Sequence, residues 1–107
     1  MNRETFGAID IGSNAIRLLI DYVEAYEDGR TEYKKAAFVR VPIRLGDDVF
    51  LRGRIGNGKA EALCDAMQGF SALFRAFAVK DYRAYATSAM REAENGSEVV
   101  SLIRNRS

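Results

Sequence analysis

The stretch AIDIGSNAIR, residues 8–17, decides the fold because it has the pattern of two strands joined by a tight turn. The short apolar run over residues 6–11 is typical of a buried strand. Over residues 15–23 the side chains alternate with a period of two, as on a strand with one buried face. The Gly-Ser-Asn tripeptide at residues 12–14 tolerates the backbone angles of a turn. The stretch therefore predicts a β-hairpin.

A third strand is predicted directly after this hairpin. The Asp-Gly pair at residues 28–29 is a turn signal, and residues 31–41 have strand-like alternation that ends before Pro42. The segment 43–58 carries several glycines among charged residues, which is typical of a loop. A short strand or a helical turn within that segment is left open. The first half of the chain thus predicts three consecutive antiparallel strands.

The second half is predicted to be mainly helical. After Asn57, which we expect to cap the helix, apolar residues recur at spacings of three and four for about six turns. The core-facing positions of this helix are Leu63, Met67, Phe70, Leu73, Phe74 and Phe77. There follow a short strand over residues 82–86, a brief helix through residue 93 that residues 95–96 stop, and a last helix over residues 97–106. The predicted order is β-β-β-α-β-α-α.

Length and composition restrict the classes of function. A chain of 107 residues forms one small domain, and its 48% apolar content is typical of a globular protein. Sixteen basic and fifteen acidic residues give a net charge of +1, so bulk charge provides no basis for binding nucleic acid or an anionic membrane. There is no histidine, and Cys64 is the only cysteine. Without a signal peptide or an apolar span, the expected compartment is the cytoplasm.

The hairpin carries the first candidate site. Asp10 at a strand end, followed by a turn with exposed amides, offers a cation site and an anion cradle side by side. Gly12 allows backbone to approach a phosphate, Ser13 and Asn14 add donors, and Arg17 could supply a charged fork. The alternative is an ordinary turn. Against it, Asp10 interrupts an apolar run, where an ionised group needs partners or a function.

The second candidate site is ATSAMREAENG, residues 86–96. A strand that leads into Thr87 and Ser88 at the start of a helix places hydroxyl groups and free amides together, which suits an anion. Arg91, one turn further on, could close over a bound phosphate. Taken alone, the pattern more often means a capped surface helix with a solvated arginine.

Both motifs together resemble the paired signature of the exopolyphosphatase and guanosine pentaphosphate phosphohydrolase family. DIGSNAIRLL at residues 10–19 and ATSAMREAENG at residues 86–96 are similar to it, and RLGDDVFLRGRI at residues 44–55 matches a third segment in the right order. The resemblance implies an α/β fold, the ribonuclease-H-like lobe of the actin, sugar-kinase and heat-shock-protein superfamily. On this basis we expect residues 1–107 to be a single N-terminal lobe of a two-lobed enzyme, truncated before its last strand.

The resemblance also implies a reaction and its residues. Members of the family hydrolyse the terminal phosphoanhydride of polyphosphate or of guanosine pentaphosphate with Mg²⁺. Asp10 would lie near the magnesium, and the expected substrate-binding residues are Gly12, Ser13, Asn14, Arg17, Thr87, Ser88 and Arg91, with Arg91 also stabilising charge. Ala15 stands where the family commonly has serine, which removes a hydroxyl but keeps the turn. The catalytic base is expected beyond Ser107, so we expect the 107-residue chain alone to be inactive.

Other readings remain open at this point. The chain could be the phosphate- or nucleotide-binding lobe of another ATPase or kinase of the same superfamily, or a non-catalytic fragment that forms a homodimer through its sheet edge. The residues do not distinguish polyphosphate from guanosine pentaphosphate. A cationic track would favour polyphosphate, although the acidic residues between its members favour an ordinary solvated surface. Its members are Lys34, Lys35, Arg40, Arg44, Arg52 and Arg54.

Overall fold

The computed structural model describes residues 1–86 and 88–106, and for Ser88, Leu102 and residues 104–106 it describes the backbone only. Its elements in chain order are β1 (Asn2–Ile11), β2 (Ile16–Ala25), β3 (Thr31–Val41), α1 (Leu45–Arg52), α2 (Asn57–Ala76), β4 (Asp81–Ala86), α3 (Ser88–Glu92) and α4 (Gly96–Arg106). The predicted hairpin, third strand, long helix, fourth strand and two final helices are all present. None of the described helices is long and apolar enough to cross a membrane.

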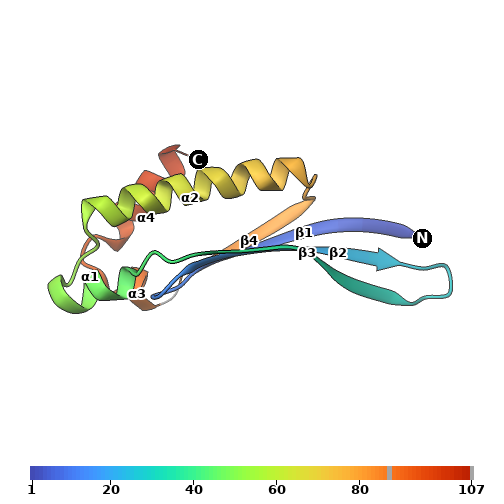
Figure 1. The fold of residues 1–107 in the computed structure, drawn as a ribbon, viewed down its shortest axis with the longest axis horizontal. Coiled ribbons are helices and arrows are strands. Elements are labelled where there is room, and N and C mark those ends of the chain that lie inside the picture. The colour runs from blue at the N-terminus through green and yellow to red at the C-terminus, as the bar shows by residue number, and fades with distance from the viewer. Residues whose placement is uncertain (87, 107) are drawn as a thin grey trace.

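The strands form one mixed sheet with the order β3-β2-β1-β4. β1 and β3 both run antiparallel to β2, whereas β4 runs parallel to β1. A parallel neighbour requires a crossover connection, and α2 is its main part. Figure 1 shows α2 and α4 on one face of the sheet, while α1 and α3 lie at the end of the sheet where β1 stops. The opposite face carries no described helix.

The core lies between the sheet and α2. Ile16, Leu18 and Ile20 alternate along β2 and have no exposed surface. The predicted apolar face of α2 packs against these residues. Four of its six expected residues are buried, and Leu73 and Phe77 are partly buried against the hydrophobic core. The helix approaches the sheet closely at Gly7 on β1, where a Cβ would come within 2.6 Å of the Phe74 ring. Glycine at that position lets the helix settle onto the sheet.

The segment left open by the sequence contains a helix, α1, so the observed order is β-β-β-α-α-β-α-α. The predicted role of Asn57 as a helix cap is wrong, because Asn57 is the first residue of α2 and Gly56 occupies the cap position. The Gly56 N–H donates to Asp48 Oδ2 at 2.7 Å. This bond, followed by one from Lys59, holds the pKa of Asp48 below its ordinary range. A carboxylate from α1 thus accepts a hydrogen bond from the backbone at the start of α2.

The first two strands extend further than their apolar residues indicated. β1 begins at Asn2 and β2 ends at Ala25, and Arg3 pairs in register with Glu24 in this extension. The Glu24 side chain is 2% exposed, 2.8 Å from Arg3 Nη2 and 3.0 Å from Lys34 Nζ. Hydrogen bonds from Arg3, and then from Lys34, lower the pKa of Glu24 from its ordinary value. Ion pairing in place of apolar packing holds this end of the sheet together.

The lowered pKa makes Glu24 a pH-dependent source of stability. A carboxyl group with a folded pKa below the unfolded one stabilises the fold above the unfolded pKa, at about pH 4.3, and this contribution is lost as pH falls through the folded pKa. We therefore expect Glu24→Gln to lower the urea midpoint at pH 7 and to flatten its fall on acidification. Glu27→Gln, at an exposed position, is the control. Parallel pH curves for wild type and Glu24→Gln would contradict this role.

Candidate functional site

The loop over residues 12–15 joins β1 to β2 and has unused backbone donors. The Gly12 N–H donates to the Ala15 carbonyl at 3.0 Å, so this amide is occupied inside the turn. The N–H groups of Ser13, Asn14 and Ala15 form no hydrogen bond within the described part of the chain. Successive unpaired amides in a turn form an anion-binding concavity. The loop can therefore accept an anion through residues 13–15.

The start of α1 holds this loop in place. The Gly46 N–H donates to the Ser13 carbonyl at 2.8 Å. A Cβ on Gly46 would lie 3.1 Å from Ser13 Cβ and 3.2 Å from Ser13 O, so glycine permits this approach. Sequence reasoning missed the role of Gly46. The available signal was its place in the RLG tripeptide at residues 44–46, within the third matched segment.

Asp10 and Arg17 are ion-paired beside the loop. They lie opposite each other in the β1–β2 register, with Arg17 Nη2 2.6 Å from Asp10 Oδ2. The partner that an aspartate in this apolar strand requires is therefore Arg17. Half of the Arg17 side chain is exposed, and a guanidinium has five N–H donors, so Arg17 can bind Asp10 and an anion together.

The loop opens into a cavity of about 290 Å³. Its lining residues are Gly12, Ser13, Asn14, Ala15, Arg17 and Arg40. Arg40 lies on β3 directly opposite Arg17 and was not among the predicted site residues. A larger hollow of about 470 Å³ between β4, α2 and α4 has no charged side chain in its lining, so the smaller cavity is the better candidate for binding an anion.

The second motif follows β4 at the same end of the sheet as the loop that follows β1. Ile11 and Ala86 are in register in the parallel β1–β4 pair, so the chain continues from both strands on the same side. Thr87 lies outside the described residues, and Ser88 begins α3. Arg91 is exposed, with its Nη1 3.4 Å from the Ala86 carbonyl, and it does not line the 290 Å³ cavity. The topology thus brings the two motifs to the same end of the sheet, where β1 and β4 stop. Arg91 nevertheless lies outside the cavity.

The end of the second motif has a structural role. The Asn95 side chain, 7% exposed, accepts from the Ile55 N–H at 2.8 Å and donates to the Ile55 carbonyl at 2.7 Å. The Glu94 N–H donates to the Gly53 carbonyl at 2.8 Å. These bonds fasten the α3–α4 junction to the link between α1 and α2. The sequence indicated only that Asn95 stops a helix.

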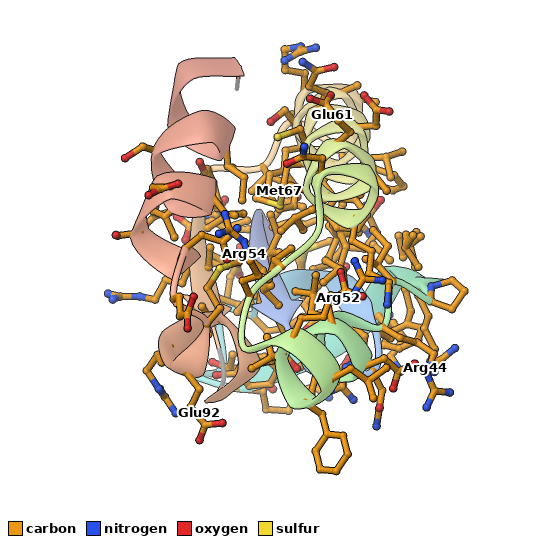
Figure 2. The ribbon with its side chains drawn as sticks, turned by 90° about the vertical axis from the view of Figure 1, so that its left-hand side faces the viewer. Arg44, Arg52, Arg54, Glu61, Met67 and Glu92 are labelled. Atoms are coloured by element: carbon orange, nitrogen blue, oxygen red, sulfur yellow. The ribbon has the colours of Figure 1, made fainter. Side chains whose placement is uncertain are left out.

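Two of the six basic residues proposed for the cationic track are paired with acidic residues. Lys34 pairs with the buried Glu24, and Arg44 pairs with Asp47 at 2.9 Å. In Figure 2, Arg44 and Glu92 project outward on opposite sides of the molecule, from the start of α1 and from α3. Of the six basic residues proposed for the track, only Arg40 lines the cavity.

The acidic residues limit the kind of metal that the site can bind. The described residues contain no group of three or more His, Cys, Asp or Glu side chains arranged to hold a metal ion. Mg²⁺ commonly binds through one or two carboxylates together with substrate phosphates and water. Asp10 beside the loop fits a magnesium ion that arrives with a phosphate. It does not provide a metal cage by itself.

The model of the Ppx/GppA phosphatase family matches residues 36–107. The chain belongs to this family. Among its Ppx/GppA relatives, Exopolyphosphatase 1 of Mycobacterium tuberculosis is 30% identical over 98 residues, which cover 92% of this chain and 27% of that protein. The Mycobacterium leprae protein of the same name is also 30% identical, and the matched residues cover 92% of this chain and 28% of that protein. The chain therefore spans less than a third of the length of these relatives.

Solved structures of Ppx/GppA proteins share the fold. The Aquifex aeolicus family member superimposes with a TM-score of 0.87 at 26% identity, over 97% of this chain and 32% of that one. An exopolyphosphatase-like protein gives a TM-score of 0.81 at 31% identity, over 98% of this chain and 31% of that one. The α/β, ribonuclease-H-like fold expected from the sequence is confirmed.

Proposed function

We propose that this chain is the phosphate-binding part of a phosphohydrolase that removes the terminal phosphoryl group of polyphosphate or of guanosine pentaphosphate. The observation that carries the proposal is the 290 Å³ cavity, where the unpaired amides of residues 13–15 lie beside Arg17. Membership of the Ppx/GppA family and the names of the mycobacterial relatives support this class of substrate.

In this proposal the loop and Arg17 hold the oxygens of the terminal phosphoryl group. Its negative charge shifts during transfer, and fixed donors that are already oriented stabilise that charge without reorganising. Asp10 keeps Arg17 oriented by their 2.6 Å contact and would hold Mg²⁺, which would neutralise phosphate charge. Thr87, Ser88 and Arg91, which follow β4 at the same end of the sheet, would contact the substrate outside this cavity.

The chain binds substrate in this scheme but does not complete hydrolysis unaided. No carboxylate of a described residue lines the cavity, so no described group is placed to deprotonate a water there. Glu92 projects outward from α3, away from the rest of the fold (Figure 2). A general base would have to lie within hydrogen-bond reach of the attacking water.

The test is calorimetric titration of the 107-residue chain with tripolyphosphate in magnesium buffer. Arg17→Gln removes a charged donor and should weaken binding about tenfold or more. The fold should change little, because exposed ion pairs contribute about 1 kcal/mol or less. Arg75→Gln, an exposed position on α2 away from the cavity, is the control for lost charge. Equal tripolyphosphate affinity of the Arg17→Gln variant and wild type would sink the proposal. A chain that binds ATP but does not bind tripolyphosphate would favour the alternative of a nucleotide-binding lobe.

A further inference from the structure

A second arginine, Arg40, lies beside the loop and has no partner among the described residues. Arg40 on β3 is in register with Arg17 on β2 and lines the same cavity. Arg17 is bound to Asp10, whereas the Arg40 side chain forms no hydrogen bond or ion pair with any residue in the described ranges. The cavity therefore contains one guanidinium held by a carboxylate and one that is unpaired.

This arrangement carries an electrostatic cost in the absence of an anion. Like charges directly opposite each other on neighbouring strands are destabilising. The cross-sheet row is Asp10, Arg17 and Arg40, so one carboxylate faces two guanidinium groups. Because Asp10 lies on the far side of Arg17 from Arg40, it cannot shield Arg40 as it shields Arg17. A negatively charged ligand between the loop and β3 would remove the cost.

We propose that Arg40 binds the phosphoryl group next to the terminal one, so that the cavity selects ligands with at least two linked phosphoryl groups over orthophosphate. This inference rests on the proposed function of the loop. The amides of residues 13–15 and Arg17 form one cluster of donors at the β1–β2 connection. Arg40 comes from the next strand, about 4.8 Å further across the sheet. Two guanidinium forks on adjacent strands can each take the oxygens of one phosphoryl group.

Calorimetry with orthophosphate and pyrophosphate, in the same magnesium buffer, tests the inference. Arg40→Gln should weaken pyrophosphate binding about tenfold and change orthophosphate binding by less than about threefold. Arg17→Gln should weaken both. Arg54→Gln is the matched control, because Arg54 is exposed, has no partner among the described residues and lies on the segment between α1 and α2 (Figure 2). It should bind both ligands like wild type.

Thermal unfolding separates ligand binding from a structural role. If Arg40 serves a ligand, Arg40→Gln should melt at the wild-type temperature or above it, because the repulsion from Arg17 is relieved. Arg40→Lys keeps the charge but loses the fork, and should recover part of the pyrophosphate affinity. Equal losses for both ligands, or unchanged pyrophosphate affinity, would overturn the role of Arg40 while leaving the loop site intact. Failure of wild type to bind either ligand would overturn the proposed function itself.

Discussion

Replacement of Gly96 by alanine is expected to lower the free energy of unfolding by about 3 kcal/mol or more. An added Cβ would lie well inside contact distance of the Met90 carbonyl oxygen. That oxygen belongs to the backbone of α3, so it cannot move away by rotation of a side chain. Met90 and Ala93 are themselves buried, and the first turn of α4 would have to separate from α3 to admit a methyl group.

Gly69 provides the matched control, because it lies in the middle of α2 with nothing within 4 Å of an added Cβ. Gly69→Ala should raise stability by about 1 kcal/mol, since alanine is the better residue in an open helical position. Urea unfolding followed by circular dichroism measures both variants. If Gly96→Ala unfolds at the wild-type midpoint, the close packing of α3 against the start of α4 is incorrect.

The elements that the sequence predicted are those whose core-facing residues recur at a regular spacing along the chain. Alternation along β2 and the three-four spacing along α2 each mark a face that packs in the core. In the eight-residue helix α1 the apolar residues do not all face the core, since Leu45 is buried whereas Phe50 and Leu51 are 90% and 74% exposed. It is held by contacts made outside the helix itself, among them the bond from Gly46 to the distant Ser13 and the bond from Gly56, just beyond the helix, to Asp48. A pattern within eight residues could not reveal these partners.

The candidate site divides in the same way. Residues 10–17 were recognisable because they are consecutive, and their chemistry follows from one turn. Arg40 was named only as one of six members of a possible cationic track, because its place opposite Arg17 depends on the β2–β3 register, which shifts between Ile20 and Asp21. The number of residues from the β2–β3 turn therefore did not determine which β3 side chain reaches the loop.

Asn95→Leu is expected to lower the free energy of unfolding by about 2–5 kcal/mol, because a buried backbone group left without a partner costs about 1–3 kcal/mol. Both the N–H and the carbonyl of Ile55 would lose their described partner, and Ile55 is 1% exposed. Urea unfolding measures the change. Asn57→Leu, an exposed asparagine at the start of α2, is the control and should change stability by about 0.5 kcal/mol or less.

Asn95→Asp separates lost hydrogen bonds from lost packing. The new carboxyl keeps an acceptor for the Ile55 N–H but faces the Ile55 carbonyl, which favours the protonated form as a donor and raises the folded pKa above the unfolded one. The folded state then binds more protons, so this variant should gain stability as pH falls from 7 toward the unfolded pKa, the opposite of the Glu24 effect. A pH-independent loss would mean that Asn95 acts through packing alone. The asparagine–glycine end of the second motif would then position α3, and with it Arg91, by shape and not by the two bonds to Ile55.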